Sequence, residues 1–283
     1  MDDIVTREKL IALNPALTIL DSVISDNLII EHNGLNRMDH SKIFIFDETM
    51  VISGGMNIGD EYSGGWHTKS GWSGETHPDH WRDYMLKAHG PATNIAKNMV
   101  FYQQSFAPQQ EPPHEDAIPI KLLKNYRYKR TEEPPPNELL PKIKQITFAI
   151  FTLIDTAKES IIIEHAYLMD QRVIDKIKAA AQRGVITTII RGKSETPSLE
   201  RANEDFFEQL YDTPNIEILT DTQILHTKLI CVDAQYSVVG SANLSRASLN
   251  DHEEISFFIS GDTPLQKQIN ERVRLAIQRL REK

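Results

Sequence analysis

The sequence has a single cysteine, no apolar run long enough to span a membrane, and no excess of positive charge. Among its 283 residues the one cysteine is Cys231, which excludes an intrachain disulfide and a zinc site built from several cysteines. A spanning helix needs about 18 consecutive apolar residues, and the N-terminal segment MDDIVTREKL lacks the apolar core of a signal peptide. With a net charge of −9, the chain is a poor non-specific binder of nucleic acid.

What is present is an ordinary globular composition that prolines divide into two parts. Hydrophobic residues make up 40% and charged residues 25%, which argues against disorder. Eight of the 14 prolines lie between Pro108 and Pro141, where they disfavour helix and central strand. We therefore expect an N-terminal lobe over 1–106, a proline-rich linker over 107–141 and a C-terminal lobe over 142–283. The basic stretch 121–130 is expected to be a solvated loop, or alternatively a contact for a phosphate or lipid headgroup.

A polar pattern occurs twice in the chain. Residues 39–57 and 225–243 align without a gap, and each reads His-x-Lys, four residues, Asp, six residues, then Gly-Gly/Ser-x-Asn. Each copy contains two β-rich apolar runs that end at small residues, which predicts strand, turn, strand and a glycine-rich end. The second copy is preceded by alternating strand-like and helix-like segments, which indicates an α/β fold.

The residue types in this pattern suit chemistry at a phosphoryl group. On a strand, a histidine and a lysine two residues apart point to one face. Ammonium and amide groups can hold phosphate oxygens while imidazole attacks phosphorus or transfers a proton. Two copies provide two histidines, so no metal or cofactor is required. The residues are His40, Lys42 and Asn57 in the first copy, and His226, Lys228 and Asn243 in the second.

The motif aspartates are expected to be structural. Asp47 and Asp233 follow their histidines by an odd number of residues, which points them to the opposite face of a strand. The alternative for the whole set is that His40 and His226 are ordinary packed histidines, which two complete copies of the pattern argue against. The glycines let the backbone approach a ligand closely.

On these residues the chain resembles the phospholipase D superfamily, whose signature is this pattern in two copies. The segments GGMNIGDEY (54–62) and HWRDYMLKAHGPA (80–92) make it most similar to the cardiolipin synthases of that superfamily. The matching residues are His40, Lys42, Asp47, Gly54, Gly55 and Asn57, and His226, Lys228, Asp233, Gly240, Ser241 and Asn243.

The resemblance implies two pseudo-symmetric α/β/α lobes with mixed sheets and one active site between them. It implies that one histidine forms a covalent phosphohistidine and the other acts as general acid, then base. By position the nucleophile would be His40 and the acid His226. A carboxylate behind each histidine would hold its tautomer: Asp83 for His40 and Glu254 for His226, with Glu253 competing for the latter. Surface salt bridging is the alternative for these carboxylates.

The first lobe is expected to be incomplete. Only residues 1–39 precede the first motif histidine, whereas residues 142–225 precede the second, so strands and a helix of the first lobe have no counterpart in the sequence. The chain is therefore interpreted as a truncated piece of a longer synthase, or as a short form whose exposed edge is covered by self-association, making it a homo-oligomer.

The function expected from these features is a phosphatidyltransferase that acts on a phosphatidylglycerol-like phospholipid. Such a protein would sit peripherally on the inner membrane surface or otherwise in the cytoplasm. The alternatives are a phospholipase D-family nuclease, which the net charge disfavours, and a non-catalytic remnant that binds lipid or phosphate.

The sequence offers several further candidate residues. A lipid-contacting loop, or simple packing, is expected for Trp66, Trp72 and Trp81, and the spacing of His67, His77 and His80 makes a weak metal-site pattern. A phosphate contact or a turn is expected at Lys193 and Ser194. We expect His165 to close a strand and Cys231 to be buried.

Overall fold

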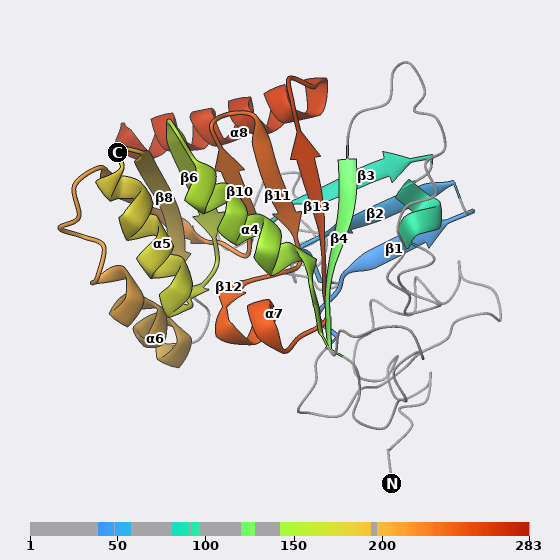
Figure 1. Ribbon diagram of the computed structural model, residues 1–283, viewed down its shortest axis with the longest axis horizontal. Coiled ribbons are helices and arrows are strands. Elements are labelled where there is room, and N and C mark those ends of the chain that lie inside the picture. Colours follow the sequence, from blue (N-terminus) through green and yellow to red (C-terminus); the bar gives the residue numbers. More distant parts are fainter. Residues whose placement is uncertain are drawn as a thin grey trace, which may run out of the picture.

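The computed structural model describes residues 39–47, 49–57, 81–90, 92–96, 120–127, 142–193 and 197–282. Two sheets of unequal size lie side by side in this part of the chain (Figure 1). Among the described residues, no helix is both long and apolar enough to span a bilayer.

The larger sheet belongs to the second lobe and has eight strands in the order β5-β4-β13-β11-β10-β6-β8-β9. β6, β8 and β9 are parallel and the other pairs antiparallel, so the sheet is mixed as expected. The strands are β4 (Ile120–Arg127), β5 (Lys142–Lys144), β6 (Ser160–His165), β8 (Ile186–Lys193), β9 (Ile216–Ile224), β10 (Lys228–Val232), β11 (Tyr236–Gly240) and β13 (Glu254–Ser260). β7 (Leu168–Met169) and β12 (Leu244–Ser245) pair in parallel outside the sheet.

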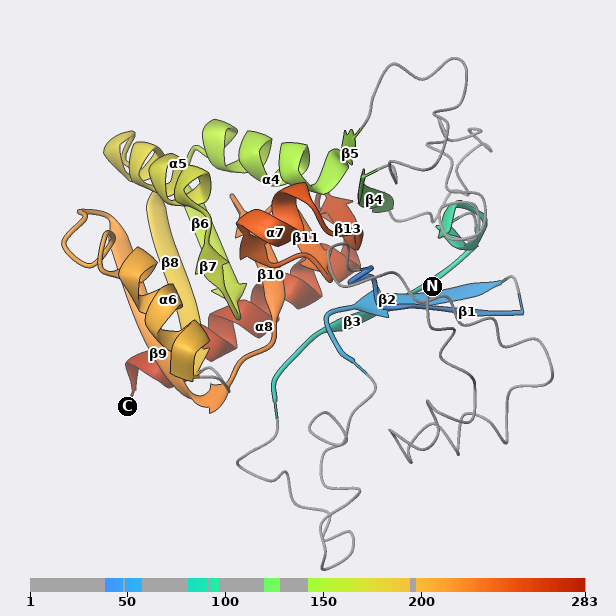
Figure 2. The same cartoon turned by 90° about the horizontal axis from the view of Figure 1, so that it is seen from below.

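Helices cover both faces of this sheet (Figures 1 and 2). Along β10, Ile230 and Val232 face the core beneath α4 and α5, whereas Leu229 and Cys231 face the core that α8 covers. This alternation is what a strand buried on both faces requires. The helices are α4 (Gln145–Thr156), α5 (Gln171–Gln182), α6 (Pro197–Phe207), α7 (Arg246–Asn250) and α8 (Pro264–Arg281).

The helix α5 shows how the sequence fixes such an element. Its buried residues recur three or four apart, which gives one apolar face toward the sheet. Asp170 accepts a hydrogen bond from the Arg172 N–H and so caps the first turn. Gly184, with φ of 91°, takes the left-handed conformation just after the helix.

The smaller sheet contains the first motif and repeats part of the larger one. Its strands β1 (Ile43–Phe46), β2 (Met50–Gly54) and β3 (Met85–His89) are antiparallel in the order β1-β2-β3. The same order is found in β10-β11-β13. The described part of the first lobe thus has three strands where the second has eight, with the short helical segment 92–96. Residues 1–38 lie outside the described part, so the expected truncation stays a prediction.

The two lobes share one apolar core. Val51 of β2 and Ala88 of β3 pack in the same buried cluster as Leu229, Phe257 and Val273 of the second lobe. The first lobe therefore docks on the face of the large sheet that α8 also covers.

The expected linker was wrong over part of its length. Residues 120–127 form β4, which pairs with β13 and β5 inside the large sheet instead of lying in a solvated loop. Leu122 and Asn125 of this strand are buried. The flanking prolines obscured a short strand whose apolar residues are interleaved with lysines. The rest of 107–141 lies outside the described residues.

Candidate active site

Both motif histidines lie just before a strand, in segments that bridge the two lobes. The His40 N–H donates to the Glu253 carbonyl at 2.9 Å, and the His226 N–H donates to the Arg82 carbonyl at 2.9 Å. These contacts belong to two isolated parallel bridges, Asp39 with Glu253 and Arg82 with Leu225. In each case the residue after the accepting carbonyl is a carboxylate. The backbone therefore brings each histidine beside an acid of the opposite lobe.

The carboxylates pair with the histidines in the opposite sense to the expected one. His40 Nδ1 lies 3.0 Å from Glu254 Oε2, and His226 Nδ1 lies 2.7 Å from Asp83 Oδ2. The expectation of Asp83 behind His40 and Glu254 behind His226 was wrong. It assumed that each lobe completes its own site, whereas docking of the two sheets places each acid against the other lobe's histidine. Glu253 contributes its carbonyl to His40, and its side chain lies 3.7 Å from Lys124.

These contacts fix the tautomer of each ring. A carboxylate needs a donor, so Nδ1 carries the proton in both imidazoles and Nε2 keeps its lone pair. Lys228 Nζ also lies 2.8 Å from His226 Nδ1. Because one ring nitrogen cannot donate to Asp83 and accept from Lys228 together, we assign the hydrogen bond to the carboxylate. Lys228 instead donates to the His226 carbonyl.

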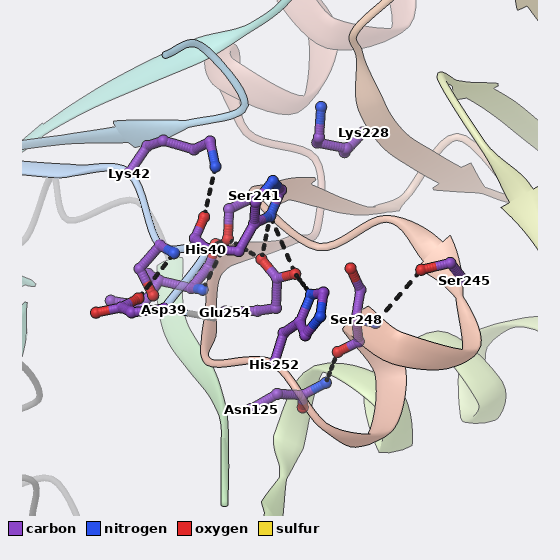
Figure 3. Close-up of polar contacts among 12 residues, drawn as sticks. Asp39, His40, Lys42, Asn125, Lys228, Ser241, Ser245, Ser248, His252 and Glu254 are labelled. Atoms are coloured by element: carbon purple, nitrogen blue, oxygen red, sulfur yellow. Dashed lines mark hydrogen bonds and ion pairs between the residues drawn. The ribbon is translucent and has the colours of Figure 1, made fainter. Parts of the chain in front are cut away.

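A residue of the motif lies against each carboxylate, and the two residues differ. Ser241 Oγ donates to Glu254 Oε2 at 2.5 Å (Figure 3). At the equivalent position Gly55 has no side chain, and a Cβ there would lie 2.3 Å from Asp83 Oδ1. The Tyr84 N–H donates to the same Asp83 oxygen at 2.7 Å. The Gly-Gly/Ser step of the motif is thus fitted to the carboxylate beside it.

The preceding glycines allow close packing of the strands. A Cβ on Gly54 would lie 2.1 Å from the Tyr84 carbonyl, and one on Gly240 would lie 2.4 Å from the Ile255 carbonyl. Both positions therefore require glycine because backbone, which cannot move aside, lies against them.

The two lysines come from different lobes into one buried cluster. Lys42 Nζ donates to the His40 carbonyl at 2.7 Å. Burial lowers the pKa of Lys42 to about 8, although Glu254, Asp83 and Asp39 oppose this. Burial lowers the pKa of Lys228 to about 7, with Asp83 opposing and Lys42 adding to the effect. Figure 3 shows Lys42 reaching the His40 carbonyl and draws Lys228 in the same view.

The pKa of His226 is lowered in the same way. Burial is the main cause, the hydrogen bond to Asp83 opposes it, and both Lys228 and Lys42 reinforce it. Because groups from both copies act on one another, the two motifs form one site and not two. Its two ammonium groups lie beside two imidazoles, an arrangement suited to a singly charged phosphodiester.

The motif asparagines and aspartates fall at opposite ends of the strands. Asn57 and Asn243 follow β2 and β11 at the histidine end, and the buried Asn243 Oδ1 has no hydrogen-bond partner among the described residues. Asp233 lies beyond the far end of β10, where its carboxylate accepts from the N–H groups of Lys158, Glu159 and Ser160. Asp47 takes the equivalent turn, with φ of 48° against 51° for Asp233. Asp233 is therefore structural, through its turn position and not through a strand face.

Two side chains at the site were not singled out clearly from the sequence. The Trp81 ring lies 5.5 Å from the His226 ring, centre to centre. The His252 ring lies 6.2 Å from the His40 ring, and its Nδ1 is 3.9 Å from Glu254 Oε1 (Figure 3). Adjacency to the carboxylates was the available signal, since Trp81 precedes Asp83 by two residues and His252 precedes Glu254 by two.

The remaining candidates are structural or lie outside the described residues. His165 is buried at the end of β6, and Cys231 is buried in β10, where burial raises the pKa of its thiol to about 12; both agree with expectation. Lys193 ends β8. No group of three metal-ligating side chains occurs among the described residues. The candidates outside that part are Trp66, Trp72, His67, His77, His80 and Ser194.

Comparisons with known proteins agree with this geometry. Residues 150–275, which include the second motif, match a family model described as "Cardiolipin synthase, PLD-like domain". A cardiolipin synthase of Clostridium perfringens (strain 13 / Type A) is 26% identical over 236 residues, covering 80% of this chain and 46% of that protein. Cardiolipin synthase 2 of Staphylococcus epidermidis (strain ATCC 35984) is 28% identical over 240 residues, covering 80% of this chain and 44% of that protein.

The chain spans about half the length of the curated relatives it matches. Among solved structures, the phosphatidylserine synthase of Haemophilus influenzae Rd KW20 shares the fold, with a TM-score of 0.60 at 15% identity over 87% of this chain and 62% of that one. The mixed α/β fold and the resemblance to the phospholipase D superfamily are both confirmed. The chain is similar to the cardiolipin synthases, and its residues 150–275 match their phospholipase D-like domain.

Proposed function

We propose that this protein is a phosphatidyltransferase that moves a phosphatidyl group from a phospholipid to an alcohol. One observation carries the proposal: two histidines, each oriented by a buried carboxylate of the opposite lobe, share one cluster with two buried lysines. Two imidazoles, each with its Nδ1 against a carboxylate, match a reaction that needs one nucleophile and one proton carrier. The similarity to cardiolipin synthases supports a phospholipid as the substrate.

The proposed reaction has two steps at phosphorus. The second histidine enters the first step as an imidazolium, with a proton on Nε2 as well as on Nδ1. The Nε2 of the other histidine attacks, a P–N bond forms, the P–O bond to the leaving alcohol breaks, and the imidazolium gives its Nε2 proton to the leaving oxygen. The acceptor alcohol then loses its proton to the second histidine and attacks phosphorus, which breaks the P–N bond. By position in the chain we assign the nucleophile to His40 and the proton carrier to His226. Lys42 and Lys228 hold the phosphate oxygens throughout.

The substrate is a lipid, so we place the protein peripherally at a membrane surface when it works. A phosphatidylglycerol-like donor fits both the chemistry and the relatives. Self-association stays a prediction, which light scattering of the purified chain would test.

Vesicles test the substrate class. Phosphatidylglycerol vesicles and, separately, single-stranded DNA are incubated with the parent protein and with the His40→Ala and His226→Ala variants. Cardiolipin or phosphatidic acid formed by the parent alone is the expected result. DNA cleavage without lipid product would overturn the proposal in favour of a nuclease, and no product from either would indicate a binding remnant.

A donor with a good leaving group separates the two histidines. Phosphatidyl-p-nitrophenol needs no proton on its leaving oxygen, so loss of the acid alone should leave the first step intact. We expect His226→Ala to release a burst of about one p-nitrophenol per site and then turn over slowly. His40→Ala should give no burst. The reverse pattern would assign the nucleophile to His226.

A further inference from the structure

Arg82, the residue before Asp83, is held by a buried ion-pair network of the second lobe. Its Nε donates to Glu164 Oε1 and its Nη1 to Asp221 Oδ2, both at 2.7 Å. The Arg82 side chain is 12% exposed, and those of Glu164 and Asp221 are fully buried. Arg279 of α8 also donates to Asp221. Since an unpaired charge at such depth is strongly unfavourable, Arg82 has little freedom to move.

Tyr84, the residue after Asp83, is held by the same glutamate. Its hydroxyl donates to Glu164 Oε2 at 2.8 Å. Burial and the neighbouring Glu164 raise the pKa of Tyr84, so its hydroxyl remains a donor at any physiological pH. One carboxylate on β6 therefore holds both neighbours of Asp83.

The backbone of Arg82 is also hydrogen-bonded to His226, the histidine that Asp83 orients. The Arg82 N–H donates to the Ile224 carbonyl at 3.0 Å, and the Arg82 carbonyl accepts from the His226 N–H at 2.9 Å. A shift of this segment would move Asp83 relative to His226 Nδ1, where the contact is 2.7 Å. The alignment of the pair thus depends on where Arg82 and Tyr84 are anchored.

In the other half of the site, the described residues hold the carboxylate in a different way. The residue equivalent to Arg82 is Glu253, whose carbonyl accepts from the His40 N–H and whose side chain lies 3.7 Å from Lys124. There the carboxylate of Glu254 is held directly by the Ser241 hydroxyl. At Asp83 the equivalent residue is Gly55, which offers no hydroxyl. The ion-pair network stands in for the missing side-chain contact.

We propose that Arg82, Tyr84 and Glu164 are positioning residues that hold Asp83 against His226 and keep the proton on its Nδ1. The effect on turnover rests on the proposed function, whereas the effect on the imidazole does not. In this proposal the three residues act through Asp83 and not by binding the substrate.

Tyr84→Phe is the sharpest test, because it removes one hydroxyl and leaves every buried charge paired. Tyr211→Phe is the matched control: its hydroxyl also donates to a glutamate, Glu204, at 2.5 Å, but on the surface around α6. Glu164→Gln is the stronger second variant. Nitrogen-15 NMR of the imidazoles gives the tautomer of His226, and kcat and KM on phosphatidylglycerol vesicles are measured across pH.

We expect Tyr84→Phe to lower kcat about 10-fold with KM unchanged, and Glu164→Gln to lower it further, since small misalignments of catalytic groups slow reactions strongly. The fraction of His226 protonated on Nδ1 should fall in both, and the pH profile should shift. Tyr211→Phe should change neither. An unchanged His226 spectrum in Tyr84→Phe would overturn the inference, even if the parent proved inactive on lipid. An altered spectrum in an inactive parent would overturn the proposed function alone.

Discussion

At the scale of single residues, the two copies of the motif differ where they meet their carboxylates. Ser241 donates a hydrogen bond to the longer Glu254, and Gly55 leaves space for the shorter Asp83. The pattern tolerates glycine or serine at this position in general. In this chain each choice is matched to the length of the acid that faces it.

Exchanging the two residues should therefore have unequal effects. In Gly55→Ser the new Cβ would lie within 2.3 Å of Asp83 Oδ1 and must push that carboxylate off His226. We expect kcat on phosphatidylglycerol vesicles to fall by about 100-fold or more. Ser241→Gly removes the hydrogen bonds of one hydroxyl, to Glu254 and from the Ile255 N–H, without a clash, and should lower kcat by about tenfold or less. Equal losses in the two variants would show that the steric fit is unimportant.

The buried lysines should make stability depend on pH. The pKa of Lys228 is about 7 in the folded protein against an ordinary 10.5, so between these pH values the unfolded chain binds more protons. Stability then rises with pH across this window, and the penalty of the buried charge is fully present below about pH 7.

Replacing this lysine with methionine should remove that dependence. In Lys228→Met the gain in unfolding free energy from pH 7 to pH 9 should be smaller than in the parent by about 1–2 kcal/mol. Urea unfolding at the two pH values measures it, with Lys121→Met on the exposed side of β4 as the control. A parent and variant with the same pH dependence would contradict the depressed pKa.

The sequence could identify which residues form the site but not which of them touch. Spacing and residue type singled out both histidines and both lysines, and the resemblance to the phospholipase D superfamily pointed to both acids. The pairing of His40 with Glu254 spans 214 positions and that of His226 with Asp83 spans 143. Such contacts depend on how the lobes dock, and a one-dimensional pattern carries no information on docking. Proximity along the chain favoured the wrong partners.

At the scale of elements, β4 supplies an end cap to a helix from another part of the chain. The side chain of Lys144, the residue at the N-cap position of α4, makes no capping hydrogen bond. Asn125 does so from the neighbouring strand, accepting from the Ile146 N–H at 3.0 Å and donating to Thr147 Oγ1 at 2.8 Å. This buried amide links β4, α4 and, through the Ser248 carbonyl, α7.

Loss of this amide should destabilise the second lobe. Asn125→Ala removes the acceptor of the buried Ile146 and Thr147 N–H groups, which we expect to lower the unfolding free energy by about 2–3 kcal/mol. Asn125→Asp keeps an acceptor for the helix and should recover part of the loss. Urea unfolding measures both, and Lys121→Ala on the exposed side of the same strand should change stability by less than about 0.5 kcal/mol. If Asn125→Ala changed the unfolding free energy as little as Lys121→Ala, β4 would not be an integral part of the second lobe.

Elements were predictable where their pattern was strong. The strands of both motifs and the helices around 171–182 and 264–281 follow from apolar periodicity and from Gly and Pro boundaries. β4 was not, because prolines on either side outweighed eight residues in which lysines interrupt the apolar positions. What makes it a strand is the free edge of β13, a tertiary partner invisible in local sequence.

At the scale of the whole molecule, the two lobes are packed as one unit. Val51 and Ala88 share a core with Leu229 and Phe257, and the buried Arg82 network crosses the same boundary. Two lobes, the first of them incomplete, could be predicted from the repeat and from the few residues that precede its first copy. The addition of β4 and β5 to the second sheet alone could not, because nothing in the motif specifies it.

This shared core predicts a single unfolding transition. All three tryptophans of the chain precede residue 82, and the Trp81 ring lies 5.5 Å from that of His226, so tryptophan fluorescence follows the first lobe and its contact with the second. Circular dichroism reports mainly on the helices of the second lobe. The two urea midpoints should coincide, and Val51→Ala should lower both together by about 1–2 kcal/mol. Separate midpoints, or a shift in fluorescence alone, would show that the lobes unfold independently.

The crossing of the carboxylates has a consequence for how such a site could originate. A chain with one copy of the motif would carry a histidine and an acid that cannot reach each other. It could build the site only by placing two identical chains around a two-fold axis, each lending its acid to the other's histidine. Fusing two copies in one chain keeps that exchange and frees the halves to diverge. The Gly55–Asp83 and Ser241–Glu254 pairs are what such divergence would produce: they occupy equivalent positions in the two halves, and different residues make them.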